Sequence, residues 1–440
     1  MPLSFARINI RAFDGATHAV HEAVTAASRL GEPRLLSLAL SMRVLVSFLV
    51  GDGFDDVNLQ KALQLDEAGD PPSAIMWPTA HRAQLLAGMG RLDDGRRELA
   101  GIRQRYIERG AEGEWMVGAF HSALNEIWRG DFAEASLIGK DAMERARHLH
   151  GDLPMSVALM IQGAVAAYAG DEPAARRDAT AALAAAARCD SPALVAVWPT
   201  TTLGFLEVSL GNYEAALDVL GPLLSAVETA PRATEIFVAP FLSDAAEALI
   251  QLDRLDEAQH LIEVLEGNGQ RLDRPWMLAL GARCRAMLQA GRGDVTAALA
   301  TAELALTQHR RLPMPFERAR SQLLLGQLQR RQRRRDASVA TLQEALQTFE
   351  QLGTALWAER AKAELARGVS GRRRSHGLTA TEEHVAELAA SGMTNRDIAA
   401  ALFISPKTVE VNLSRVYRKL NIHSRTQLYR ALDALKLESD

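Results

Sequence analysis

Residues 404–420, ISPKTVEVNLSRVYRKL, combine cations, small polar side chains and apolar side chains at helical spacing. One face of the predicted helix is apolar, formed by Val409, Leu413, Val416 and Leu420. The opposite face repeats this spacing with Lys407, Val411, Ser414 and Arg418, and is bordered by Thr408, Asn412, Arg415 and Lys419. A helix in a DNA groove requires such a second face, because donors and small apolar groups read base edges while flanking cations hold phosphates.

Different side chains of this segment are expected to contact the phosphates, the base edges and the flanking backbone of duplex DNA. Phosphate at the helix N-terminus would be held by Ser405, Lys407 and Thr408. Base edges would be approached by Val411, Asn412 and Ser414. The flanking backbone would be contacted by Arg415, Arg418 and Lys419. The start of the preceding helix would assist through Thr394, Asn395 and Arg396.

Glu410 is an acidic residue on the face that would meet DNA. It could accept a hydrogen bond from the N4 amino group of cytosine, or it could only pair with Lys407 one turn back and lower the affinity. Asn412 could contact adenine or a phosphate. These alternatives remain open at the level of the sequence.

Four short helices with clear end signals are predicted around this stretch. Capping boxes are formed by Thr379 with Glu382 and by Thr394 with Asp397. The third helix is expected to be capped by Ser405, with Pro406 at its first position, where the missing N–H costs nothing. A fourth helix begins near Ser424. The second and third helices, joined by a tight turn, form a helix-turn-helix arrangement.

The segment LTATEEHVAELAASGMTNRDIAAALFISPKTVEVNLSRVYRKLNIHSRTQL resembles the LuxR-type DNA-binding domain, a four-helix module at the C-terminus of many bacterial regulators. The matching positions are Leu378, Thr379, Glu382, residues 392–395, Ile398, Ala399, Leu402, Ile404, Ser405, Thr408, Val409, Lys419, Leu420 and Arg425. Many relatives have lysine where Glu410 stands and histidine where Asn412 stands, so their DNA preference is not transferable. The resemblance also implies binding to a two-fold DNA site as a homodimer, which the limited reach of one short helix favours as well.

The segments PMPFERARSQLLLGQLQRR and LGTALWAERAKAEL resemble the helical-repeat region before that domain in large ATP-binding LuxR regulators of actinomycete type. Those regulators carry an N-terminal ATPase with a GxxxxGK[ST] loop. Here GRGDVT and GVSGRRRS lack the Gly-Lys-Ser/Thr that would hold phosphates. The resemblance therefore covers the sensor and DNA-binding half, and no cofactor is expected. The chain is expected to be either a natural short relative or a product lacking its front end.

A pattern with a period of about 40 residues runs through residues 1–366. In each copy a small or charged turn precedes an alanine-rich helix, and equivalent positions 40, 40, 41, 42 and 40 residues apart are Gly95, Ala135, Ala175, Ala216, Ala258 and Ala298. A weaker copy places Ala340 another 42 residues on. Such helical hairpins must stack to bury their apolar stripes. We therefore predict an all-α fold, a superhelix of tetratricopeptide-like hairpins followed by the four-helix domain.

The superhelix would form a concave groove for a peptide, a partner helix or a small effector. Tryptophans that either line this groove or, more commonly, pack between hairpins are Trp77, Trp115, Trp128, Trp198, Trp276 and Trp357. Histidine and glutamate pairs at helical spacing lack a third ligand, so no metal site is predicted. The basic run at residues 330–335 either touches phosphate or is a solvated turn.

Composition narrows the class of protein. Residues 371–440 hold 11 Lys and Arg against 8 Asp and Glu, whereas the whole chain has a net charge of −4, which leaves −7 on the remainder. Cys189 and Cys284 predict reduced thiols rather than a disulfide framework. The uncharged stretch 153–170 is expected to be a buried helix rather than a membrane span. Motifs of hydrolases, metalloproteases and phosphate loops are absent from the sequence, so an enzyme is not expected.

The sequence therefore predicts a helical-repeat sensor or interaction domain at 1–367, a flexible basic linker at 368–377 and a LuxR-type domain at 378–440. The expected function is a cytoplasmic bacterial transcription regulator, associated with the nucleoid when bound to DNA. Its expected partners are promoter DNA, a second copy of the chain and an effector at the repeats, with RNA polymerase as a candidate. The alternative is a repeat scaffold with vestigial DNA binding.

Overall fold

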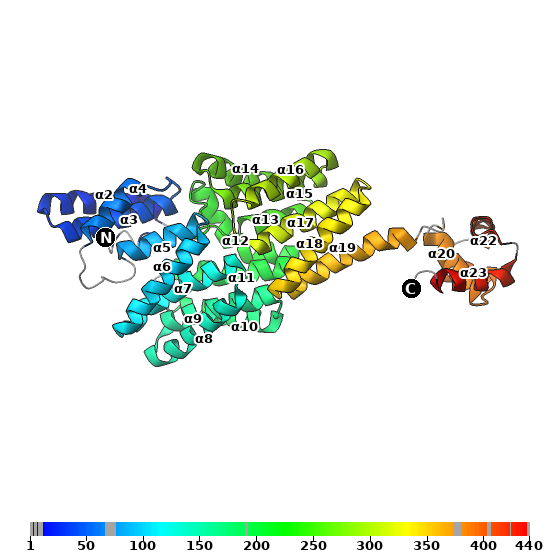
Figure 1. Cartoon of the computed structure of the whole chain (residues 1–440), viewed down its shortest axis with the longest axis horizontal. Coiled ribbons are helices and arrows are strands. Elements are labelled where there is room, and N and C mark those ends of the chain that lie inside the picture. Colours follow the sequence, from blue (N-terminus) through cyan, green and yellow to red (C-terminus); the bar gives the residue numbers. More distant parts are fainter. Residues whose placement is uncertain are drawn as a thin grey trace. The chain divides into compact units, whose positions relative to one another are not determined.

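The computed structural model describes residues 3, 7, 12–66, 76–189, 192–373, 378, 380–402, 406–422 and 424–437. Helices joined by turns make up these residues, and no strand occurs among them, which confirms the predicted all-α class. The chain divides into two compact units, Met1–Lys362 and Ala363–Asp440 (Figure 1). Each unit is described by itself.

The first unit is a series of helices in which each packs against the next. Its helices are α2 (Phe13–Leu30), α3 (Pro33–Leu49), α4 (Asp56–Leu65), α5 (Pro78–Gly88), α6 (Leu92–Glu108), α7 (Glu112–Arg129), α8 (Phe132–Leu149), α9 (Asp152–Ala169), α10 (Glu172–Ala186), α11 (Pro192–Leu210), α12 (Tyr213–Thr229), α13 (Leu242–Gln251), α14 (Leu255–Leu272), α15 (Pro275–Gly291), α16 (Val295–His309), α17 (Pro315–Arg331), α18 (Arg335–Leu352) and α19 (Ala355–Arg373), the last of which continues into the second unit.

One turn geometry recurs through this series. The turns in which the residue before the N-cap has a positive φ include those at Gly90, Gly130, Gly170, Gly211, Asp253, Gly293 and Arg333. In each turn the next amide donates to a carbonyl five residues back, as Asp131 N does to Glu126 O at 2.9 Å. This bond satisfies a carbonyl at the end of the first helix. The residue that donates it is also the N-cap of the second helix. The repeated Gly-Asp of the sequence therefore closes one helix and opens the next.

The predicted register of the repeats is confirmed for six copies. The small residues chosen to align them are all buried, namely Gly95, Ala135, Ala175, Ala216, Ala258 and Ala298. The seventh assignment was wrong, because Ala340 is exposed. Its equivalent is Ser338, 40 residues after Ala298, which is buried and donates its hydroxyl to Gly326 O at 2.7 Å. A serine fits this close approach because a carbonyl of the neighbouring helix accepts its proton.

Later helices fold back on earlier ones, so that part of the series closes on itself. Trp357 Nε1 of α19 donates to Ser209 Oγ of α11 at 3.0 Å, across 148 residues of sequence. The turn after α7 also lies against α17, since a Cβ on Gly130 would be 2.9 Å from Pro315 Cγ. Aromatic rings fill the interior, including a stacked pair formed by Tyr168 and Phe205 with centroids 4.4 Å apart. Much of the expected concave groove is therefore occupied by the chain itself.

Most of the tryptophans are buried, as expected if they pack between hairpins. Five are buried, namely Trp77, Trp115, Trp128, Trp276 and Trp357, and Trp198 is half-buried.

Both cysteines are free thiols, as expected. Among the described helices, α9 is long and apolar enough to cross a membrane, but 44% of that window is buried within the protein, where α9 packs on α8 and α10.

The end of α19 differs from the expectation. The sequence predicted that helix formers stop at Arg367, but α19 continues to Arg373, through the first part of the expected linker. Gly368 and Gly371 weaken a helix without ending it, and arginine is a good helix former. Residues 374–377 lie outside the described part of the chain.

The turn geometry predicts how stability responds to substitution. Arg333 has φ +61° where five equivalent turns have glycine. Because a left-handed conformation costs a non-glycine residue roughly 1 kcal/mol, Arg333→Gly is expected to raise the free energy of unfolding by about 0.5–1 kcal/mol. Gly293→Ala, at φ +89° with nothing within 4 Å of the added Cβ, is expected to lower it by about 1 kcal/mol. Urea unfolding measures both, and changes of the same sign would contradict this account.

Candidate nucleic-acid interface

The second unit contains four short helices after the end of α19. They are α20 (Ala380–Ala390), α21 (Asn395–Ala401), α22 (Pro406–Lys419) and α23 (Arg425–Leu437). Their shared core consists of Leu378, Val385, Ala386, Ala389, Ile398, Ala399, Val409, Leu413, Val416 and Leu428. Helix α22 packs on both α20 and α21, which fixes its axis against the rest of the unit.

The turn into α21 is held by the predicted capping box. Gly392 has φ +94° and ends α20. Thr394 Oγ1 donates to Asp397 Oδ2 at 2.6 Å, Thr394 N donates to the same oxygen at 3.2 Å, and Asp397 N donates back to Thr394 Oγ1 at 3.3 Å. The hydroxyl and the amide of Thr394 lower the pKa of the Asp397 carboxyl. Thr394 is exposed, but its side chain is engaged in starting this helix.

Arg425 ties the last helix to the same turn. Its guanidinium donates to Ala389 O at 3.2 Å, to Asn395 Oδ1 at 3.1 Å, and to Met393 O. Three bonds from one side chain fix where α21 begins relative to α20. Sequence reasoning noted Arg425 as a matching position without assigning it this role, because no local pattern connects residues so far apart.

Helix α22 has the two faces that its spacing predicts. Val409, Leu413 and Val416 are buried, and Leu420 just beyond the helix is half-buried. On the other side lies what we call the exposed row, Lys407, Val411, Ser414 and Arg418, all of which are exposed. Val411 is 42% exposed, which is unusual for a large apolar side chain in this chain. The row is therefore accessible within this unit.

Asn412 does not lie with the exposed row. It is only 7% exposed, and its Nδ2 donates to Thr408 O at 2.9 Å. The reason is geometric, because Asn412 stands three residues after Val409 and four before Val416, which turns it toward the apolar side. A base or phosphate contact by Asn412 stays a prediction.

Lys419 also has a structural partner. Its Nζ lies 2.5 Å from Glu382 Oε2 of α20, and the Glu382 side chain is only 3% exposed. Within the domain its charge neutralises a buried carboxylate, and contact of Lys419 with the DNA backbone stays a prediction. The predicted capping partner of Glu382, Thr379, lies outside the described residues.

The remaining predicted residues form a mixed but mainly cationic surface. Thr408, Arg415 and Arg396 are exposed, and Asn395 is half-buried with its amide oxygen held by Arg425. Glu410 is exposed, and within the described residues it forms no ion pair with Lys407. Ser405 lies outside the described residues. Cations on the exposed side of α22 are thus Lys407, Arg415 and Arg418.

The comparison with protein families concerns this unit. Residues 376–432 match the family of bacterial regulatory proteins named after luxR. The C-terminal domain is a LuxR-type helix-turn-helix domain. A nitrate/nitrite response regulator homologue of Haemophilus influenzae is 50% identical to this LuxR-type domain over 48 residues, covering 11% of the chain and 23% of that protein.

A longer relative extends into the repeats that precede the LuxR-type domain. A protein of Mycobacterium tuberculosis named as an HTH-type transcriptional regulator is 29% identical over 350 residues, covering 70% of this chain. The chain spans only 38% of the length of that relative. Among solved structures, the Cut9-Hcn1 hetero-tetramer of the APC/C aligns with a TM-score of 0.50 and 15% identity, covering 83% of this chain and 71% of that one. That likeness concerns the helical-repeat fold alone.

Two adjacent cations in the LuxR-type domain are expected to differ in their effect on stability. Lys419→Met removes the ammonium group that lies 2.5 Å from the buried Glu382 carboxylate, so we expect the free energy of unfolding to fall by about 1–3 kcal/mol. Arg418→Met removes an exposed cation of the same helix, and we expect a change within about 0.5 kcal/mol. Chemical unfolding of the full chain distinguishes them, and equal losses in the two variants would refute the structural role of Lys419.

Proposed function

We propose that this protein is a bacterial transcription regulator that binds promoter DNA through its LuxR-type domain. The observation that carries the proposal is the exposed row on α22, whose opposite face is buried in the domain core. A helix that is fixed along one side and carries Lys407, Val411, Ser414 and Arg418 along the other fits the major groove of duplex DNA.

The proposed contacts follow from residue type and position. Phosphate at the start of α22 would be bound by Lys407 and Thr408, together with Ser405 of the preceding turn. Base edges would be met by Val411 and Ser414, and Glu410 is free to accept from a cytosine amino group. The flanking backbone would be contacted by Arg415 and Arg418, with Arg396 assisting from α21.

Domain organisation and partners belong to the same proposal. We assign residues 1–367 to a repeat domain, 378–440 to the DNA-binding domain and the basic segment 368–377 to their connection. The protein would act in the cytoplasm and at the nucleoid, as a homodimer on a two-fold DNA site, because one short helix reads few base pairs. RNA polymerase is a candidate partner at the promoter.

Control would come from an effector bound to the repeat domain. A small molecule can shift DNA affinity only if it binds better to one arrangement of the protein than to another. The closed part of the repeat series, where α19 meets α11, is the part whose arrangement such an effector would change. The proposal contains no catalytic step, and the named relatives are regulators. The second candidate, a repeat scaffold with vestigial DNA binding, is favoured only by the acidic balance of the repeats.

Substitution at Arg418 tests the DNA-binding proposal. Genomic fragments retained by the protein supply the site, and Arg418→Ala is expected to weaken binding to that site severalfold. The slope of log affinity against log salt should become shallower by about one for the lost phosphate contact. Arg310→Ala, an exposed arginine of the first unit, serves as the control and should leave both quantities unchanged. Binding that ignores sequence and survives Arg418→Ala would favour the scaffold.

A further inference from the structure

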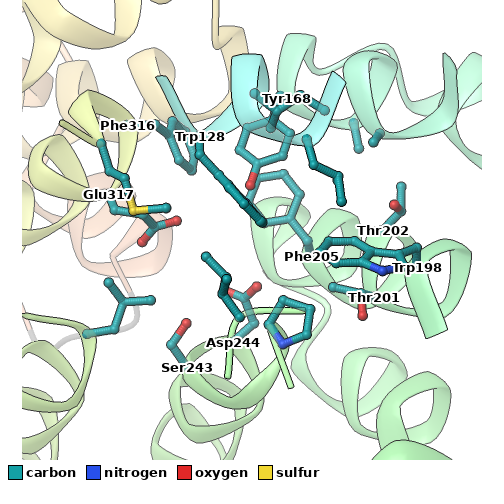
Figure 2. Close-up of a pocket in the computed structure, with 18 of the residues that line it drawn as sticks. Trp128, Tyr168, Trp198, Thr201, Thr202, Phe205, Ser243, Asp244, Phe316 and Glu317 are labelled. Carbon is teal, nitrogen blue, oxygen red and sulfur yellow. The ribbon is translucent and has the colours of Figure 1, made fainter. Parts of the chain in front are cut away.

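A pocket lies inside the closed part of the repeat series (Figure 2). Its walls come from α7, α9, α11, α13, α15 and α17, so helices from both sides of the closure surround it. Its cavity volume is about 70 Å³. The sequence analysis named Trp128, Trp198 and Trp276 as possible groove residues, and all three line this pocket. It did not bring them together with the rest of the lining, because the walls are far apart along the chain.

One wall of the pocket is aromatic. Figure 2 shows Trp128, Tyr168, Trp198, Phe205 and Phe316 around the same space. Trp128 and Trp198 are 6.3 Å apart between centroids and tilted by 49°, so their rings are not stacked face to face. Aromatic faces carry negative charge density and attract cations as well as apolar groups.

The other wall of the pocket is acidic. The charged side chains in the lining are Asp244 and Glu317, and both carboxylates are drawn toward the space in Figure 2. Their cationic partners Arg320 and Arg283 are not part of the lining. Arg320 donates to Asp244 Oδ1 at 2.7 Å and to Glu317 Oε1 at 3.3 Å, and Arg283 donates to Glu317 Oε2. A ligand therefore meets carboxylate oxygens and no guanidinium group.

A polar side chain without a partner also lines the pocket. Thr202 is only 7% exposed, and no hydrogen bond of its hydroxyl occurs among the described residues. The neighbouring Thr201 Oγ1 is buried and likewise has no hydrogen-bond partner in the described part of the chain. Buried hydroxyls without partners are costly, and a ligand that supplies a donor or acceptor removes that cost.

The size of the cavity limits what it can hold. A volume of about 70 Å³ corresponds to roughly five water molecules at roughly 10–15 Å³ each. Five waters occupy about 150 Å³, since each takes about 30 Å³ of liquid volume, and this is about the space of a single aromatic ring. An oligosaccharide or a peptide is too large for this pocket.

We propose that this pocket binds a small organic cation, an amine carried on one aromatic ring or an apolar group of similar size. The ring packs against Trp128, Trp198 and Phe205, while the ammonium group donates to Asp244 and Glu317. An anion is disfavoured because its charge would face two carboxylates. This inference rests on the proposed function, of which it identifies the effector class, and the ligand would bridge α11 and α17 on the two sides of the closure.

Calorimetric titration of the full chain with three matched probes tests the charge requirement. The probes are 2-phenylethylamine, which is cationic, 2-phenylethanol, which is neutral, and 3-phenylpropanoate, which is anionic. We expect the amine to bind at least about tenfold more tightly than the alcohol, because a hydrogen bond from a charged donor is stronger than one from a neutral donor, and we expect the anion not to bind. Equal affinity for all three, or no binding of the amine, would overturn the inference without any substitution.

Variants then place the ligand in the pocket. Asp244→Asn keeps the shape of the side chain and should weaken amine binding by about tenfold or more, with little effect on the alcohol. Thr202→Val removes the hydroxyl and should weaken binding of both probes by a smaller factor. Asp218→Asn, an exposed aspartate on α12, is the matched control and should bind the amine as the unmodified chain does. Unchanged amine affinity in a folded Asp244→Asn and in Thr202→Val would overturn the assignment.

DNA binding, measured separately with and without 2-phenylethylamine, distinguishes this inference from the proposed function. Intact DNA binding with no amine binding overturns the pocket assignment and leaves the regulator. Amine binding by a chain that binds no specific DNA overturns the regulator and leaves the pocket assignment. Amine binding that leaves DNA affinity unchanged supports the pocket and overturns its role as the effector site.

Discussion

The closure of the repeat domain depends on one buried guanidinium group. Arg320 of α17 donates to both Asp244 and Glu247 of α13 at 2.7 Å, and it lies 4.5 Å from the ring centroid of Trp357 on α19. Helices that are far apart in the repeat order are thereby joined at one point. Without this cation, carboxylates that are almost fully buried would face one another, because α13 and α17 both contribute acids there. The same arrangement turns Asp244 and Glu317 toward the cavity.

The sequence predicts the repeats well because their signals are local. A positive-φ residue, a capping Asp and a small residue one turn later are read within a few positions, as at Gly130 and Asp131. Ser338 escaped notice because its fit depends on Gly326 O of the neighbouring helix. The sequence also did not predict the bond from Trp357 to Ser209 or the pocket beside it, because 148 residues separate that pair. Helical periodicity contains no information on contacts at such a separation.

The LuxR-type domain shows the same limit at smaller scale. Periodicity identified the exposed row on α22 and the buried face opposite it, but the boundary between them was less certain. Asn412 and Lys419 stand at that boundary, and packing assigns both to the domain itself, the first through Thr408 O and the second through Glu382. A short helix that packs on its domain along one side and presents side chains along the other has few positions between the two faces, so packing also engages the residues at the border.

Contact between α19 and α11 has a consequence for how the repeat domain can change in length. In an open solenoid each repeat touches only its neighbours, so adding or deleting one merely lengthens or shortens the array. Here an extra hairpin of about 40 residues between α11 and α19 would carry Trp357 away from Ser209 and Arg360 away from Val208 O. The number of hairpins in this stretch is therefore fixed by closure. The same constraint extends to the helices before α7, because Gly90 lies against Leu312 and the Phe48 ring lies 5.1 Å from the Arg274 guanidinium.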